Sequence, residues 1–149
     1  MAEPCLRPMT EADLEGAARV EKTCFSEPWS MNLLADVLKS DLDEAWVLEG
    51  EDGTLIGYMN FRFLCGEGEL MRIAVLPEYR GRGYSRKMMD QLAEAAGTQG
   101  VPDLTLEVRA GNQTARNLYK AYGFKEEALR RGYYQNPTED AVIMWRRGF

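Results

Sequence analysis

The sequence predicts a mixed α/β domain, and three observations support this fold class. The chain has 149 residues, which suits one domain with one hydrophobic core. Segments of alternating strand-like pattern are separated by segments with apolar residues at helical spacing, as in mixed α/β proteins. No repeat, low-complexity stretch or Pro/Ser-rich linker divides the chain. We therefore expect a single domain over residues 1–149.

The N-terminal half is expected to form three strands and two helices. Residues 5–9 predict a short edge strand, and Thr10 is placed to cap a first helix with an acidic first turn. A second helix is expected over residues 30–39, which carry apolar residues on one face. Strands over 45–49 and 55–64 follow. Asp52 and Gly53 between them are typical of a hairpin turn.

The C-terminal half alternates between strands and helices. Residues 69–76 predict a strand ended by Pro77, and the pattern becomes helical from about Arg80, with Gly97 and Gly100 ending the helix. A strand over 104–108 precedes a helix that is capped by Asn112 and terminated by Gly123. Residues 124–131 and 141–146 predict two final strands.

The chain contains no histidine, and this absence limits its chemistry. Nucleophilic mechanisms that pair serine or cysteine with histidine are excluded, as are zinc sites with imidazole ligands. Any general base must be a carboxylate, lysine, tyrosine, thiolate or water.

The net charge and the absence of targeting signals indicate which partners and which cell compartment to expect. The formal net charge of −6 argues against direct nucleic-acid binding and suits an enzyme that attracts basic peptides or amines. The sequence has no apolar run of the roughly 20 residues that span a bilayer, and the N-terminus does not resemble a signal peptide. We expect a cytoplasmic protein with no membrane contact.

The three cysteines are odd in number and widely spaced: Cys5, Cys24 and Cys65. This pattern favours reduced core thiols over a disulfide framework or a metal site. No metal is expected.

Residues 73–87 carry the most informative pattern in the chain. An apolar strand runs into a turn rich in glycine and arginine, and four of the eight residues from 80 to 87 are basic in a protein of negative net charge. Unpaired amides and the positive end of a helix make a ready anion site, and Gly81 and Gly83 leave room for a phosphate to approach the main chain. The pattern indicates a ligand with several phosphates.

The simplest alternative for this segment is a glycine turn before an ordinary helix with basic surface residues. Two known phosphate-binding motifs fit it poorly. The phosphate loop of nucleotidases requires a Gly-Lys-Ser/Thr that does not follow here, and the dinucleotide fingerprint requires a third glycine that is missing.

The segment Arg80-x-x-Gly83-x-Ser85, after a strand and Pro77, resembles the Arg/Gln-x-x-Gly-x-Gly/Ala signature of the GNAT acetyltransferase superfamily. The resemblance implies a mixed, mostly antiparallel sheet of about 6–7 strands flanked by about 4 helices, and acetyl-CoA as co-substrate. It implies pyrophosphate contacts by Gly81, Arg82, Gly83, Tyr84, Ser85 and Arg86, and main-chain contacts to the pantetheine arm by Ile73, Ala74 and Val75. Ser85 stands where Gly or Ala is usual, which places the helix start slightly farther from the phosphate.

A narrower resemblance covers most of the chain from Phe25 to Met144. The segments 25–30, 106–124, 130–134 and 139–144 are similar to those of the bacterial ribosomal-protein-alanine N-acetyltransferase (RimI) family. This resemblance implies that Glu107 is the general base, Tyr119 the general acid, and Asn112 a hydrogen-bond donor or acceptor to the cofactor. Tyr133 and Tyr134 are candidates for the peptide-binding wall.

Acid-base energetics agree with these roles. Removing the proton of an α-amine with a pKa near 8 at pH 7 costs roughly 1.4 kcal/mol, against roughly 4.6 kcal/mol for a lysine. A carboxylate can therefore activate an N-terminal amine with modest tuning. The alternatives are that Glu107 is a solvated strand residue, Tyr119 a core aromatic, and Asn112 only a helix cap.

The leading function is acetyl transfer from acetyl-CoA to the N-terminal alanine of a small-subunit ribosomal protein. Acetylation of a lysine or a small amine by the same superfamily is the nearest alternative. A non-catalytic module that binds acyl-CoA and a partner is the second, although such a module has no need of both Glu107 and Tyr119.

Overall fold

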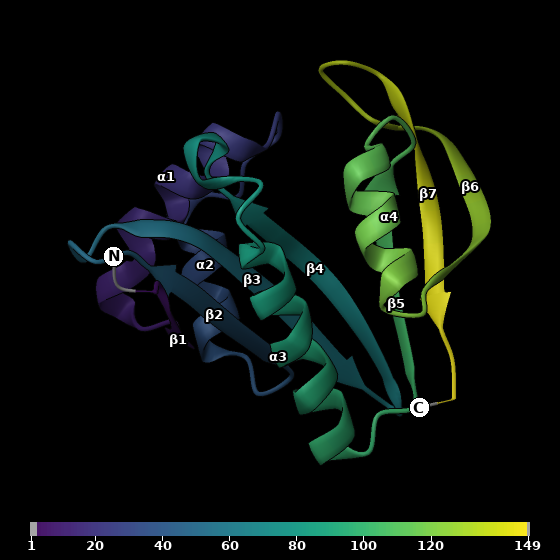
Figure 1. The fold of residues 1–149 in the computed structure, drawn as a ribbon, viewed down its shortest axis with the longest axis horizontal. Helices are drawn as coiled ribbons and strands as arrows, with labels where there is room; N and C mark the ends of the chain where they lie inside the picture. The colour runs from purple at the N-terminus through teal and green to yellow at the C-terminus, as the bar shows by residue number, and fades with distance from the viewer. Residues whose placement is uncertain (1–2, 149) are drawn as a thin grey trace.

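The computed structural model describes residues 3–148 as a sheet of seven strands with helices on both faces (Figure 1). The strands are β1 (Cys5–Pro8), β2 (Asp43–Glu49), β3 (Leu55–Leu64), β4 (Glu67–Val75), β5 (Asp103–Arg109), β6 (Lys125–Tyr134) and β7 (Glu139–Arg146). The helices are α1 (Leu14–Cys24), α2 (Met31–Lys39), α3 (Tyr84–Gln99) and α4 (Gln113–Ala121), with short 3₁₀ turns at Glu11–Asp13 and Pro77–Tyr79.

The strand order is β1-β2-β3-β4-β5-β7-β6, and every neighbouring pair is antiparallel except β4 with β5. A parallel pair needs a crossover, which α3 provides. The predicted mixed, mostly antiparallel sheet with four helices is confirmed.

The sheet opens between β4 and β5. These strands pair only from Glu67 with Asp103 to Leu70 with Leu106. A bulge in the β3–β4 ladder leaves Met71 without a partner, and beyond it β4 continues beside β3 while β5 continues beside β7. Figure 1 shows the two strands diverging from this point. The gap they leave is the centre of the candidate site.

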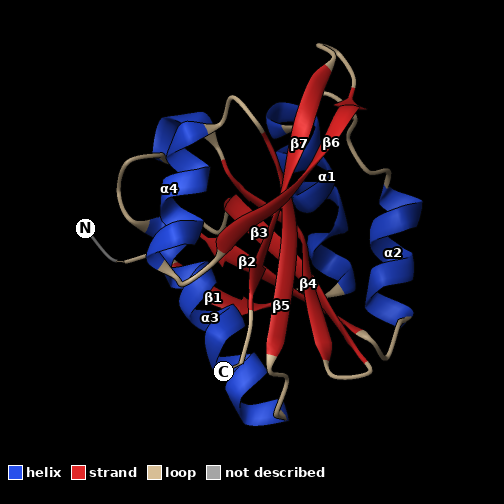
Figure 2. Cartoon of the chain, turned by 90° about the vertical axis from the view of Figure 1, so that its right-hand side faces the viewer, coloured by secondary structure: helices blue, strands red, loops and turns tan. Residues whose placement is uncertain are grey.

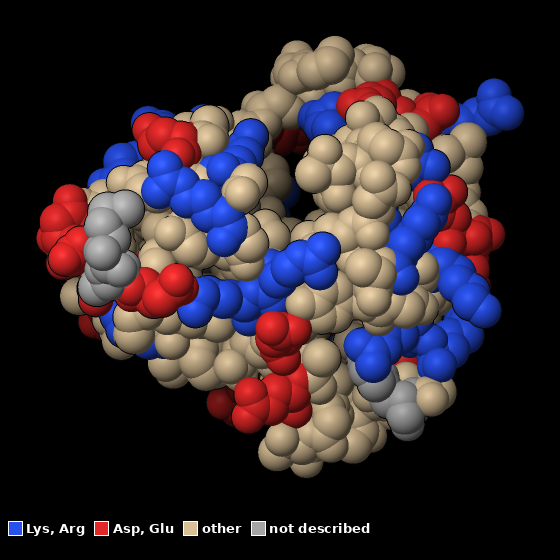
Figure 3. Space-filling view, in the orientation of Figure 1, with Lys and Arg blue, Asp and Glu red and all other residues tan. Residues whose placement is uncertain are grey.

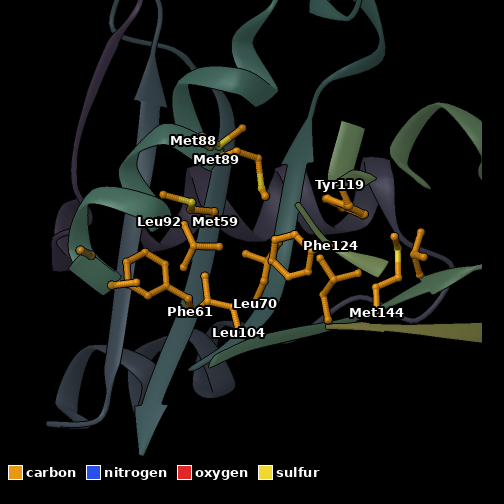
Figure 4. Close-up of a cluster of buried hydrophobic side chains, with 14 of the residues drawn as sticks. Met59, Phe61, Leu70, Met88, Met89, Leu92, Leu104, Tyr119, Phe124 and Met144 are labelled. Carbon is orange, nitrogen blue, oxygen red and sulfur yellow. The ribbon is translucent and has the colours of Figure 1, made fainter. Parts of the chain in front are cut away.

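Helices cover both faces of the sheet, α1 and α2 on one and α3 and α4 on the other (Figure 2). One apolar cluster lies between the sheet and α3 and α4, and it includes Met88, Leu92, Leu104 and Phe124 (Figure 4). A second cluster packs α1 and α2 against the opposite face. The first cluster contains residues of β3, β4, β5 and β7, so it joins the two halves of the opened sheet.

Most predicted elements form close to their expected positions, but α3 begins later than predicted. The helix starts at Tyr84 instead of about Arg80, because Gly81 and Gly83 adopt left-handed backbone with φ of 80° and 81°. At the other end Gly97 lies inside the helix and only Gly100, with φ of 66°, terminates it. The glycine-rich segment is therefore a turn that precedes the helix.

The expectation of core cysteines is wrong for two of the three. Cys5 and Cys65 are exposed, and Cys24 is half-buried; all three are free thiols. Cys65 lies in the tight turn between β3 and β4, where its own backbone has φ of 53°. Within residues 3–148, no cluster of three or more acidic, cysteine or histidine side chains could hold a metal ion. No helix over the same residues is long and apolar enough to span a membrane.

Candidate active site

The divergence of β4 and β5 opens a cleft of about 880 Å³. Its walls come from both strands, from the α1–α2 connection, and from the ends of β6 and β7. Figure 3 shows it as a deep hollow between the two halves of the molecule. Glu107, Tyr119, Asn112, Tyr133 and Tyr134, all singled out from the sequence, line this one cleft.

Glu107 and Tyr119 approach the cleft from opposite faces of the sheet. Along β5, Leu106 and Val108 are buried in the cluster beneath α3 and α4, so Glu107 between them points to the other face. Tyr119 belongs to α4 and packs in that same cluster. A group lying between the diverging strands could therefore meet a carboxylate on one side and a phenol on the other.

Glu107 is held by groups that leave it partly open to the cleft. Its side chain is 24% exposed, and its Oε1 accepts a hydrogen bond from Arg130 Nη1 at 3.1 Å. A hydrogen bond between Tyr133 and the Glu107 carboxylate, together with burial, raises the pKa of Tyr133. Both partners come from β6, so the C-terminal hairpin fixes the orientation of this carboxylate.

Tyr119 is almost fully buried, with 6% of its surface exposed, and its ring packs edge-on against Phe124 at 6.2 Å between centroids (Figure 4). Burial raises the pKa of Tyr119 well above its usual value. Its hydroxyl makes no hydrogen bond to any described residue, and the residue lines the cleft. The phenol therefore stays protonated and keeps its donor for a bound molecule.

The predicted phosphate turn presents a run of free amides. The backbone N–H groups of Gly81, Arg82, Gly83, Tyr84 and Ser85 donate to no backbone or side-chain group of residues 3–148. No atom lies within 4 Å of the position that a Cβ would take at Gly81 or Gly83. These amides precede or begin α3, whose dipole adds to their attraction for an anion.

Lys and Arg side chains gather around the hollow on the face that carries α3 and α4 (Figure 3). Arg80 bonds to the protein itself: its Nε donates to the carbonyl of Val75 at 2.8 Å and links the turn to β4. The free amides, the open space and the positive charge fit the diphosphate of coenzyme A.

The three predicted pantetheine contacts are not equivalent. Ile73 lines the cleft, whereas Ala74 and Val75 do not. The Val75 carbonyl is already bonded to Arg80, and Cys24 Sγ lies 3.6 Å from it. The edge of β4 that faces β5 has no strand partner beyond Leu70 within the described residues, so its main chain is open to a bound molecule near Ile73.

Asn112 serves as a helix cap and also lines the cleft. Its Oδ1 accepts a hydrogen bond from the backbone N–H of Ala115 at 3.1 Å. Its amide NH₂ makes no hydrogen bond among the described residues and is the part of the side chain that could reach a ligand.

Sequence reasoning missed Glu69, Arg72 and Arg109, which also line the cleft. Burial, and then the charge of Glu107, raise the pKa of Glu69. A local signal existed, because all three are charged residues that lie within or directly after the segments 69–76 and 104–108, which the sequence predicts as strands. Their partners lie far away in the sequence, so the pattern alone could not reveal their contacts.

Arg109 joins the two sides of the cleft. Its Nη2 donates to Ser26 Oγ at 2.7 Å, from the α1–α2 connection, and to the carbonyl of Gln135 at 3.1 Å, from the β6–β7 connection. Ser26 Oγ itself donates to the Gln135 carbonyl at 2.9 Å. The α1–α2 and β6–β7 connections are thus in contact, and together they bound one side of the hollow (Figure 3).

Known proteins with similar sequence and structure share this architecture. The ribosomal protein bS18-alanine N-acetyltransferase of Escherichia coli K12 is 33% identical over 136 residues, covering 89% of each chain. The enzyme of the same name from Haemophilus influenzae is 33% identical over 137 residues, covering 89% of this chain and 90% of the other. The crystal structure of the ribosomal-protein-S18-alanine N-acetyltransferase from Escherichia coli superimposes with a TM-score of 0.88 at 30% identity, covering 97% of this chain and 93% of that one.

The model of the acetyltransferase (GNAT) family matches residues 14–124, which include the predicted phosphate turn, Glu107 and Tyr119. Together with the similarity over nearly the whole length of both relatives, this match establishes that the chain belongs to the GNAT family and is an acetyl-CoA-dependent N-acetyltransferase.

Proposed function

We propose that this enzyme acetylates the N-terminal α-amine of a protein, and that its substrate is a small-subunit ribosomal protein that begins with alanine. The observation that carries the proposal is the pairing of Glu107 and Tyr119 on opposite sides of one cleft. The names of the relatives, which act on the alanine of bS18, support the choice of substrate. A ribosomal substrate would place the reaction in the cytoplasm.

Bound acetyl-CoA would supply the activated acetyl carbon and a thiolate leaving group. Its diphosphate would lie on the free amides of Gly81 to Ser85, and its arm would follow the open edge of β4 at Ile73. The Asn112 amide would add one hydrogen bond.

Glu107 would act as the base, directly or through one water. It takes the proton that the amine must lose, so that the nitrogen can form its new bond to the acetyl carbon. Arg130 donates to one oxygen of this carboxylate and so orients it.

Tyr119 would act as the acid on the opposite side. As the bond between carbon and sulfur breaks, its hydroxyl donates a proton to the sulfur. The raised pKa of Tyr119 keeps the hydroxyl protonated at neutral pH. Both residues regain their starting protonation from solvent, and no covalent enzyme intermediate is needed.

Two features favour an α-amine over a lysine. The α-amine needs less help from the base, by roughly 3 kcal/mol. The contact between Ser26, Arg109 and Gln135 also bounds the cleft on one side, which suits a chain that ends at its reactive amine.

The test is an assay with acetyl-CoA and short peptides that follows release of the free thiol. Peptides with a free N-terminal alanine should react, and the same peptides with a blocked N-terminus and an internal lysine should react far more slowly. Equal rates would identify a lysine or small-amine acetyltransferase. Binding of acetyl-CoA without thiol release on any amine would identify a non-catalytic acyl-CoA-binding module.

A further inference from the structure

Arg72 ties the segment 25–30, which joins α1 to α2 and lines the cleft, to strand β4. Its guanidinium carbon lies 4.1 Å from the ring centroid of Phe25 and 4.6 Å from that of Trp29. Its Nη2 donates to the backbone carbonyl of Glu27 at 3.0 Å. One side chain of the sheet thus contacts three residues of this segment.

A fully buried carboxylate completes the attachment. Glu21 Oε1 accepts from Arg72 Nη2 at 3.1 Å and from the backbone N–H of Trp29 at 2.8 Å. Its other oxygen accepts from the hydroxyl of Tyr58, and burial together with Glu21 raises the pKa of Tyr58. The segment is therefore fixed to α1, β3 and β4 at once.

The place of Arg72 on β4 connects the segment with the chemistry. Arg72 lies two residues beyond Leu70, where pairing with β5 ends, and next to Ile73 at the open edge. Arg109 occupies a similar place on β5, three residues beyond Leu106, and bonds to Ser26 of the same segment. Each diverging strand therefore sends one arginine to the segment 25–30.

Resting on the proposed function, we propose that Arg72 is a positioning residue for the peptide substrate. By stacking between Phe25 and Trp29 and bonding to Glu27, it holds the segment 25–30 in place as a preformed wall on the face of the cleft that carries Glu107. A wall that is already ordered does not have to be ordered by the peptide, which strengthens binding. The free amides that fit the diphosphate lie elsewhere and do not depend on it.

The experiment uses Arg72→Lys, which keeps a positive charge beside Glu21 but loses the planar group that contacts the rings of Phe25 and Trp29. We expect the KM for an alanine-starting peptide to rise at least tenfold, while kcat stays within about threefold of the parent value. The rise in Tm produced by coenzyme A should stay within about 1 °C of that of the parent. Hydrogen exchange of the Trp29 amide should become faster, while that of β5 stays unchanged. An unchanged KM and unchanged exchange at Trp29 would overturn the proposal.

Arg62→Lys is the matched control, since Arg62 on β3 pairs with Asp43 on β2 at 3.0 Å and neither residue lines the cleft. A similar rise in KM in this variant would mean that general destabilisation is the cause. If Arg72→Lys does not fold, Phe25→Leu leaves the ion pair with Glu21 intact and removes one stacked ring. Exchange at Trp29 should then still increase, and no increase contradicts the proposal. The exchange readout needs no turnover, so it remains valid if the parent protein fails to acetylate the peptide.

Discussion

Glu69 and Glu107 lie on adjacent parallel strands with their side chains on the same face of the sheet. Glu69 pairs in register with Thr105, and Glu107 follows two residues later on β5. Both line the cleft, and no salt bridge or side-chain hydrogen bond joins Glu69 to another described residue. Burial and the neighbouring charge of Glu107 disfavour the charged form of Glu69 more than Arg62 and Arg130 favour it, so the pKa of Glu69 is raised.

Replacing this carboxylate should therefore stabilise the protein at neutral pH. Because the folded-state pKa of Glu69 is raised, the folded protein binds its proton more tightly, and stability falls as pH rises from about 4.3 through the raised value. Glu69→Gln should increase Tm at pH 7 by about 1–2 °C. The gain should vanish near pH 3, where the Glu69 carboxyl of the parent is protonated in both the folded and the unfolded state. Thermal unfolding followed by circular dichroism at both pH values measures this.

Glu127 offers a control of opposite sign. Arg147 holds it at 2.8 Å and lowers the pKa of Glu127, so Glu127→Gln should lower Tm slightly at pH 7 or leave it unchanged. A lower Tm for Glu69→Gln at pH 7 would mean that its charge is stabilising.

The phosphate turn can be tested with two glycines in similar backbone conformations. Gly83 has φ of 81° and Gly53, in the β2–β3 hairpin, has φ of 84°, and both face open space. Aspartate at either position should cost about 1 kcal/mol of backbone strain. Only Gly83→Asp should also abolish the rise in Tm produced by coenzyme A, because its carboxylate repels the phosphates. A full thermal shift in Gly83→Asp would exclude this turn as the diphosphate site.

The sequence alone could indicate only those parts of the candidate site whose residues are close together in the chain. Gly81, Gly83 and the helix that follows form a local pattern, because turn conformation and helix dipole depend on neighbouring residues. Glu107 and Tyr119 could be named only through a family resemblance. Their convergence depends on the divergence of β4 from β5, which no single segment encodes.

Features that depend on long-range contacts were not predicted. The start of α3 was placed too early, at about Arg80, because Gly81 and Gly83 adopt left-handed backbone that delays the helix to Tyr84. Residue type alone predicts that Cys5 and Cys65 are buried. Both are exposed, because Cys5 lies at the start of β1 and Cys65 in the turn between β3 and β4. Arg72 and Arg109 appear as ordinary strand residues because their hydrogen-bond partners are 45 or more and 26 or more residues away, respectively.

Removing the candidate base should slow turnover in a manner that depends on pH. Glu107→Gln should keep coenzyme A affinity and lower kcat about 10²–10⁴-fold, the usual range for one acid-base group. Raising the pH from 7 to 9 should restore part of the loss, since more of the α-amine is then neutral. Initial rates across this range, with saturating peptide, measure the effect. A pH-independent loss would indicate that Glu107 has a structural role.

Replacing the candidate acid should give a different profile. Tyr119→Phe removes one hydroxyl that has no protein partner among the described residues, so folding and coenzyme A binding should be preserved. We expect kcat to fall about 10²–10³-fold, because the departing sulfur loses its proton donor. Alkaline pH should not restore the rate, since neutralising the amine does not replace that donor.

Tyr122→Phe is the control, because Tyr122 lies at the C-terminal end of the same helix, α4. Its hydroxyl bonds to Asp90 at 2.6 Å and to the Arg86 carbonyl, and the residue does not line the cleft. This variant should lose some stability and keep its kcat within about twofold, so equal losses of kcat in both variants would show that the Tyr119 hydroxyl has no chemical role.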